Sequence, residues 1–218
     1  IKCNNVKDNV FFVSGIDTNV GKSYATGYLA KTWNEQGVRT ITQKFIQTGN
    51  VGMSEDIELH RKIMGTGLLP EDESGLTMPE IFTYPCSPHL AAEIDHRPID
   101  FDKIEKATRQ LSETYDAVLL EGAGGLMVPL TRDLLTIDYV AQKNYPLIFV
   151  TSGKLGSINH TLLSLEAVTR RGIRLHTVAY NLFPEEDDDI IRRDTEAYIR
   201  DLLAKEYPET HFEIVPKL

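Results

Sequence analysis

A short glycine-rich segment carries the clearest chemical signal in this 218-residue sequence. It reads Gly15-Ile-Asp-Thr-Asn-Val-Gly21-Lys22-Ser23 and lies between an apolar run and an amphipathic stretch. Glycines in such a turn let successive backbone N–H groups point at phosphate oxygens. The lysine ammonium would neutralise the outer phosphates, and the serine hydroxyl would ligate Mg²⁺. The segment therefore predicts a phosphate-binding loop (P-loop) for ATP or GTP, with one residue more between its glycines than the usual spacing.

Three further charged residues follow predicted strands or begin a predicted helix. Lys44 ends the second predicted strand, a position at the ligand-binding edge that favours contact with a phosphate or carbamate. Glu121 follows four apolar residues and precedes a glycine-rich stretch, where an acid can hold Mg²⁺ directly or through water. Asp56, taken alone, is better explained by its favourable position in the first turn of a helix. His89 and His160 are assigned no chemistry, because an isolated histidine is more often structural.

The elements that position these residues alternate regularly between strand and helix. Apolar β-branched runs predict strands at 10–14, 39–45, 116–120, 146–151, 173–181 and 211–215. Amphipathic stretches predict helices at 21–36, 54–64, 87–94, 100–114, 135–143, 158–171 and 188–205, with residues 65–85 mostly irregular. This order predicts a single α/β domain over residues 1–218, with a mostly parallel sheet covered by helices on both faces. The polar residues that follow the strands should then converge at one edge of the sheet.

Composition excludes several classes of protein. The chain is 41% hydrophobic and 25% charged, with a net charge of −9, which argues against nucleic-acid binding. It has no apolar run long enough to span a membrane. Two cysteines, Cys3 and Cys86, make neither a disulfide framework nor a zinc site, so we expect a cytoplasmic protein. Residues 1–9 are expected to be disordered or to have been added to the native chain.

Taken together, these motifs resemble those of the dethiobiotin synthetase family. The resemblance covers residues 10–181 and includes the extra residue of the phosphate loop, which is the family's own form. The segments that carry it are 15–23, 44–49, Ser87-Pro-His89, Glu121-Gly-Ala-Gly-Gly125 with Pro129-Leu130, and Lys154-Leu-Gly-Ser-Ile-Asn-His160. It implies a P-loop ligase of biotin synthesis that uses MgATP and CO₂ to close a ureido ring on 7,8-diaminopelargonic acid. The implied intermediates are an N-carbamate and a carbamic–phosphoric anhydride.

The resemblance also implies roles for individual residues. Thr18, Lys22 and Lys44 would be catalytic, and Ser23, Asp56 and Glu121 would ligate Mg²⁺. The implied nucleotide contacts are Asn19, Val20, Gly21, Lys22, Ser23, Tyr24, Asp56, Glu121, Gly122, Ala123, Gly124, Asn181 at the adenine ring, and Pro216. The diamine would contact Thr48 and, through its carboxylate, Leu155, Gly156, Ser157, Ile158 and Asn159 of a partner subunit. A homodimer with shared active sites follows from that last assignment.

Two alternatives remain open at this point. One is another amide-forming P-loop synthetase, such as a cobyrinic acid diamide synthase, although 218 residues leave no room for a glutaminase domain. The other is a regulatory ATPase of the partitioning or Min type, although its additional early lysine in the phosphate loop is missing here. Asn19 stands where relatives often carry Glu, and Ser23 replaces the commoner Thr. Because residues 185–218 match the family least, the preference among ATP, CTP and GTP is left open.

Overall fold

A computed structural model of the chain describes residues 8–183 and 188–217. The expectation of a disordered or added segment at 1–9 lies mostly outside these residues. Asn9 is described, and its Nδ2 donates hydrogen bonds to the carbonyls of Ser112 (3.0 Å) and Tyr115 (2.9 Å). Within the described ranges, no helix is both long and apolar enough to cross a membrane.

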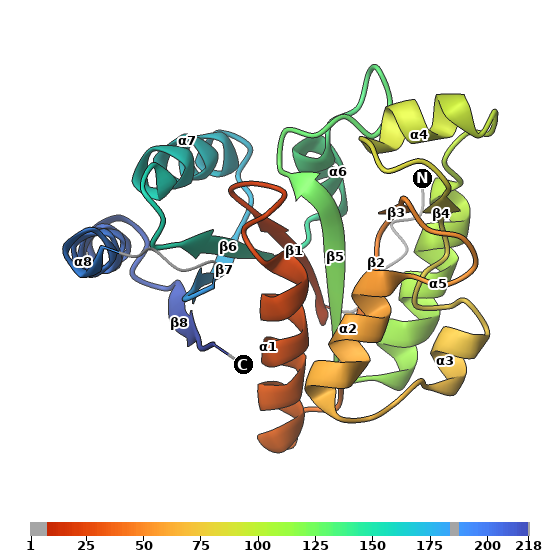
Figure 1. Ribbon diagram of the computed structural model, residues 1–218, viewed down its shortest axis with the longest axis horizontal. Coiled ribbons are helices and arrows are strands. Elements are labelled where there is room, and N and C mark those ends of the chain that lie inside the picture. The colour runs from red at the N-terminus through yellow and green to blue at the C-terminus, as the bar shows by residue number, and fades with distance from the viewer. Residues whose placement is uncertain (1–7, 184–187, 218) are drawn as a thin grey trace.

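The centre of the molecule is a six-stranded parallel sheet with the strand order β2-β5-β1-β6-β7-β8 (Figure 1). Its strands are β1 (Val10–Gly15), β2 (Thr40–Lys44), β5 (Ala117–Gly125), β6 (Leu147–Ser152), β7 (Leu175–Asn181) and β8 (His211–Val215). Two short strands, β3 (Gln47–Thr48) and β4 (Ile81–Phe82), pair separately beside β2. The predicted α/β architecture with a mostly parallel sheet is confirmed.

Eight helices are described, and those that pack on the sheet cover both of its faces. They are α1 (Lys22–Glu35), α2 (Glu55–Met64), α3 (Pro70–Glu73), α4 (Pro88–Ile94), α5 (Phe101–Thr114), α6 (Thr136–Lys143), α7 (Ser157–Arg170) and α8 (Asp189–Glu206). Successive strand residues face opposite sides, so Val13 packs with Leu29 of α1 while Phe12 joins the cluster that includes Ile104 of α5. Helices α6, α7 and α8 also contribute to the cluster that contains Phe12. Helix α2 packs beside α1.

Every strand and helix predicted from the sequence has a counterpart here, but β5 is longer than predicted. The prediction ended this strand at residue 120 and placed Glu121 in the turn that follows. Instead, β5 continues to Gly125, which pairs with Gly15 of β1. The glycines permit this continuation, since a Cβ on Gly122 would lie 2.9 Å from the ring of Phe12. Glu121 is therefore fixed inside the sheet.

The segment 65–85 is mostly irregular, as predicted, apart from α3 and β4. Sequence patterns did not indicate either element, because α3 is a single turn and β4 has only two residues. Helix α3 is tied to α2 by the buried ion pair between Asp72 and Arg61, whose shortest separation is 2.8 Å.

The topology determines where a ligand can bind. Strand β1 lies between β5 and β6, and the chain crosses to β2 on one side and to β6 on the other. The loop after β1 therefore opens at the point where the crossover connections diverge, which is the usual ligand position in an open parallel sheet.

Candidate active site

The phosphate loop joins β1 to α1 and folds around the lysine that begins the helix. Gly21 has a φ of 80°, a left-handed conformation that glycine adopts without strain. Lys22 is buried, and its Nζ donates hydrogen bonds to the carbonyls of Asp17 (2.8 Å) and Thr18 (3.3 Å). Burial lowers the pKa of Lys22 to about 8, although the Glu121 carboxylate opposes this shift. The loop thus holds an ammonium group close to its own backbone.

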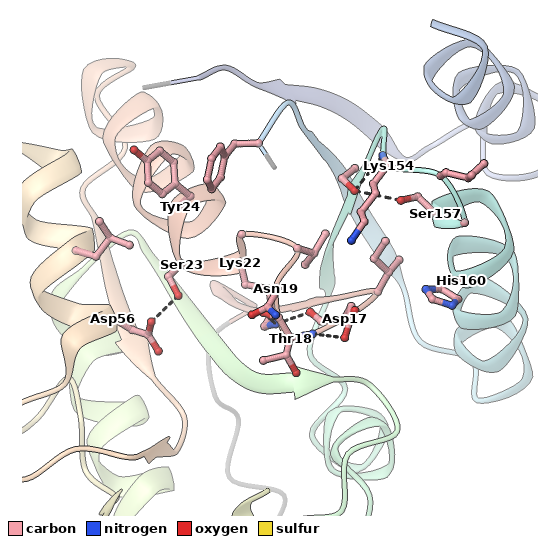
Figure 2. Close-up of a pocket in the computed structure, with 18 residues that line it drawn as sticks. Asp17, Thr18, Asn19, Lys22, Ser23, Tyr24, Asp56, Lys154, Ser157 and His160 are labelled. Atoms are coloured by element: carbon pink, nitrogen blue, oxygen red, sulfur yellow. Dashed lines mark hydrogen bonds between the residues drawn. The ribbon is translucent and has the colours of Figure 1, made fainter. Parts of the chain in front are cut away.

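A cavity of about 580 Å³ opens above this loop (Figure 2). Its floor is formed by residues 16–24, and its walls come from α2, the end of β6 and the start of α7. Lys154 extends into the cavity from the connection between β6 and α7, opposite Ser23 and Asp56. The volume of the cavity fits a small-molecule ligand.

Three oxygen-bearing side chains from distant parts of the chain meet at Ser23. The Ser23 Oγ lies 2.7 Å from Oδ1 of Asp56 and 2.8 Å from Oε1 of Glu121. Ser23 belongs to α1, Asp56 to α2 and Glu121 to β5. Hydroxyl and carboxylate oxygens are the ligands that Mg²⁺ prefers, so this donor set fits the ion. No group of three His, Cys, Asp or Glu side chains with metal-binding geometry occurs in the described residues, so a cation here would rest on two carboxylates and a hydroxyl.

Lys44 links the two carboxylates. Its Nζ lies 2.5 Å from Asp56 Oδ2 and 2.8 Å from Glu121 Oε1, and it donates a 3.3 Å hydrogen bond to the carbonyl of Gly122. Burial alone would lower the pKa of Lys44, but the two carboxylates hold it above its ordinary value. Likewise, burial would raise the pKa of Glu121, but Lys44 and His60 hold it far below the usual range. At neutral pH this buried group therefore carries its charges as ion pairs.

The structure adds residues that sequence reasoning missed. His60 is fully buried and lies 2.7 Å from Glu121 Oε2 through its Nε2. Its position four residues after Asp56 is the signal that could have indicated it, because residues at that spacing share one face of a helix. Lys154, His160 and Phe183 line the cavity as well. Each follows a strand or begins a helix at the ligand-binding edge.

Most of the loop residues expected to bind the nucleotide line the cavity, and so does part of the predicted diamine segment. These residues are Thr18, Asn19, Val20, Gly21, Lys22, Ser23, Tyr24, Asp56, Leu155, Gly156 and Ser157. Ile158 and Asn159 lie in the first turn of α7, next to this lining. The remaining predicted residues are outside the lining set: Lys44, Thr48, Glu121, Gly122, Ala123, Gly124, Asn181 and Pro216. Of these, Gly124 lies beside the loop, since a Cβ there would be 3.8 Å from Thr18 Oγ1.

Asn181 contacts the phosphate loop. Its Nδ2 donates to the carbonyls of Val20 (2.9 Å) and Gly21 (3.4 Å), and its Oδ1 accepts from the backbone N–H of Phe183 (3.1 Å). The close approach explains a requirement for glycine at position 21, where a Cβ would lie 2.2 Å from that nitrogen. The contact of Asn181 with an adenine ring stays a prediction.

Solved structures share this fold at low sequence identity. The MinC:MinD cell division complex of Aquifex aeolicus matches with a TM-score of 0.54 at 12% identity, over 96% of this chain and 82% of that chain. A ParA family ATPase from Chlorobium tepidum matches with a TM-score of 0.54 at 12% identity, over 97% and 86%. Chloroplast FtsY of Physcomitrella patens matches with a TM-score of 0.53 at 15% identity, and this chain covers 61% of it. These similarities concern the fold alone.

Sequence comparison is more specific. A family model described as an AAA domain matches residues 9–216. The ATP-dependent dethiobiotin synthetase BioD 2 of Pasteurella multocida is 53% identical over 206 residues, which cover 94% of this chain and 96% of that protein. The protein of the same name from Haemophilus influenzae is 57% identical over 184 residues, covering 84% and 96%. Since these relatives match over nearly their full length, the chain belongs to the ATP-dependent dethiobiotin synthetase family.

Proposed function

We propose that this chain closes the ureido ring of dethiobiotin, using 7,8-diaminopelargonic acid, CO₂ and ATP and releasing ADP and phosphate. The family of the chain supports the reaction. The observation that carries it in the structure is the buried ammonium of Lys44, held between Asp56 and Glu121 beside the phosphate loop. That arrangement places an ammonium group and oxygen ligands for a cation where a triphosphate and a second anion would meet.

The chemistry proceeds in three steps. One amine of the substrate attacks CO₂ and loses a proton, which gives an N-carbamate. A carbamate oxygen then attacks the γ-phosphorus of ATP and ADP leaves, forming a carbamic–phosphoric anhydride. Finally the second amine attacks the carbonyl carbon, loses a proton and expels phosphate, which closes the ring. Holding both amines around one carbon supplies much of the rate advantage.

The protein must bring an anionic carbamate against an anionic triphosphate. In the proposal, Lys22 and Lys44 provide positive charge that offsets this repulsion, and Thr18, which lines the cavity, would lie beside the reacting groups. The backbone N–H groups at the start of α1, with the positive end of the helix dipole, would hold phosphate oxygens. The desolvated position of Lys22 strengthens its attraction for phosphate, because charge is screened less in a buried site.

Ser23, Asp56 and Glu121 would hold Mg²⁺ in this proposal. When bound, the ion would neutralise negative charge that develops on phosphate oxygens during transfer. The nucleotide site would be completed by four residues that line the same cavity, Asn19, Val20, Gly21 and Tyr24. The proposal also assigns nucleotide contacts to residues 122–124, Asn181 and Pro216.

The substrate's carboxylate would bind at the start of α7, at Leu155, Gly156, Ser157, Ile158 and Asn159, while Thr48 contacts the diamine end. Backbone N–H groups at a helix N-terminus suit an anion. We place this segment in the active site of a partner subunit, so that the working form is a homodimer. The exposed side chains of Leu155 (74%) and Leu163 (58%) near this end of α7 support a contact surface. A cytoplasmic location is part of the same proposal.

Phosphate release from MgATP with bicarbonate tests the function. We expect release to depend on 7,8-diaminopelargonic acid and to disappear in Lys22→Ala. Lys205→Ala, which removes an exposed lysine of α8, is the matched control and should keep wild-type release. Hydrolysis that is indifferent to the diamine would contradict the proposal and favour a regulatory ATPase on the same fold.

A further inference from the structure

A row of buried polar side chains lies behind Glu121, and the reaction proposed above does not use it. Arg61, Thr42 and His60 are each no more than 1% exposed. Arg61 Nη1 lies 2.8 Å from Thr42 Oγ1, which in turn lies 3.0 Å from His60 Nδ1. His60 Nε2 then lies 2.7 Å from Oε2 of Glu121. Buried polar groups of this kind are costly unless they are paired, so a fully paired row requires an explanation.

The chemistry of the four groups fixes the direction of two of these hydrogen bonds. A guanidinium can only donate, so the Thr42 oxygen accepts from Arg61. An ionised carboxylate can only accept, so Nε2 of His60 donates to Oε2 of Glu121. The Thr42 hydroxyl, 3.0 Å from Nδ1, holds the imidazole ring from its other side. Asp72 fixes the start of the row by binding Arg61 through both carboxylate oxygens, at 2.8 and 2.9 Å.

This direction matters because Glu121 divides its two oxygens between two tasks. Oε2 is held by His60, while Oε1 faces Ser23 and Lys44. Without the imidazole, the carboxylate could rotate and exchange its oxygens. His60 is also one turn after Asp56, so α2 supplies one oxygen ligand and the group that orients the other. Groups that orient metal ligands typically change metal affinity or activity by about 10–100-fold when they are removed.

We propose that His60 is a positioning residue of the Mg²⁺–nucleotide site, which acts by holding Oε2 of Glu121 so that Oε1 stays directed at Ser23. The proposal rests on the metal ligands proposed above. It adds a residue that none of the sequence motifs includes, and it gives the buried Arg61–Thr42 pair a role in holding the imidazole ring in place.

Two substitutions that differ by one methylene group separate positioning from general structure. In His60→Gln the side-chain amide nitrogen can occupy the position of the imidazole Nε2, so its N–H still reaches Glu121. In His60→Asn the shorter side chain places its amide nitrogen only at the position of Nδ1, which faces Thr42. We would measure the Mg²⁺ concentration that gives half-maximal ADP binding, by titration calorimetry without any diamine. We expect His60→Asn to raise this concentration by about 10–100-fold and His60→Gln to restore most of the affinity.

Thr108→Val is the matched control for the loss of a buried hydrogen bond. The hydroxyl of Thr108 is buried on α5 and donates to Gln43 at 2.8 Å, away from the cavity. We expect this variant to lose stability without any shift in the Mg²⁺ requirement. An equal shift in Thr108→Val and His60→Asn would overturn the proposal, since it would mean that any loosening of this half of the sheet has the same effect.

A double-substitution cycle with Glu121→Gln tests whether His60 acts through that carboxylate. If it does, adding His60→Asn to Glu121→Gln should cause little further loss of Mg²⁺ affinity, because coupled residues are non-additive. A full additional loss would refute the positioning role. Wild-type ADP binding that is independent of Mg²⁺ would instead refute the metal site itself. If the wild-type protein binds MgADP but shows no diamine-dependent phosphate release, that result would count against the proposed function alone.

Discussion

At the scale of single residues, the candidate site must attract an anion although it contains few charged side chains. The chain has a net charge of −9, yet its proposed ligand is a polyanion. Lys22 and Lys44 are both buried at the phosphate loop, and Lys44 is paired with two carboxylates. Because these two ammonium groups and the two carboxylates cancel, the positive charge that a polyanion requires would come from a cation held by the carboxylates and from the backbone N–H groups at the start of α1. The site can therefore bind an anion within an acidic protein.

Asn181 supports a prediction that separates two roles for its side chain. Its amide contacts the carbonyls of Val20 and Gly21, so Asn181→Ala should loosen the phosphate loop. We expect the affinities for ATP, GTP and CTP to fall together, by about two- to tenfold for the lost hydrogen bonds. Calorimetry with the three Mg-nucleotides measures this. Asn34→Ala, at the far end of α1, is the control, and a loss confined to ATP would show that Asn181 reads the base.

At the scale of elements, the charged residues of the candidate site lie on strands and helices. Strand β5 carries Glu121 between β1 and β2, and α2 carries Asp56 and His60 on one face. Helix α1 begins directly at Lys22. Groups on such elements keep their mutual geometry better than groups on loops, which favours a site that must align several charges.

An aromatic cluster of Phe11, Trp33, His176 and His211 links β1, α1, β7 and β8 and gives a pH-dependent prediction. The ring of His176 lies 4.8 Å from that of Phe11 and 5.2 Å from that of His211, measured between centroids. Burial lowers the pKa of His176 to about 4, with His211 adding to the effect. The folded protein therefore binds fewer protons than the unfolded chain between about pH 4 and 6.5, so this contribution to stability is lost as pH falls through that window.

His176→Phe should remove this dependence because phenylalanine keeps an aromatic ring without a titrating group. The melting temperature is measured by circular dichroism at a series of pH values between 4 and 7. We expect a shallower fall toward acid pH than in the wild type. His96→Asn is the control, because asparagine tolerates the positive φ of 50° at that position. Identical slopes for His176→Phe and the wild type would contradict the prediction.

At the scale of the whole molecule, the parallel sheet places the loop after β1 beside the ends of β2, β5 and β6. This chain's own residues 155–157 line the same cavity as its phosphate loop. The proposal that these residues bind the substrate's carboxylate in the site of a partner subunit therefore concerns the assembly and not the single chain. The shared-site proposal requires that two defective subunits can complement each other.

Mixing Asn159→Ala subunits with Lys44→Ala subunits tests that requirement. In a mixed dimer, one site would combine an intact Lys44 with an intact Asn159 from the partner, and the other site would lack both. Random pairing makes half of the dimers mixed, so we expect up to about a quarter of wild-type synthetase activity. The assay is dethiobiotin formation after coexpression. Complete absence of recovery would mean that each site lies within one subunit.

Sequence patterns alone predicted the phosphate loop, the order of strands and helices along the chain, and the edge of the sheet where the candidate site lies. These follow from local spacing and from periodicity, which are set by residues near one another in the chain. Three-dimensional contacts were needed to show that β5 continues past Glu121, that Lys44 is buried between two carboxylates, that His60 contacts Glu121 and that Asn181 contacts the phosphate loop. Asn181 and Val20 are far apart in sequence, and they meet only because β7 ends beside the loop that follows β1. Periodicity indicates that strands exist, but the order of the strands within the sheet and their register determine which side chains become neighbours.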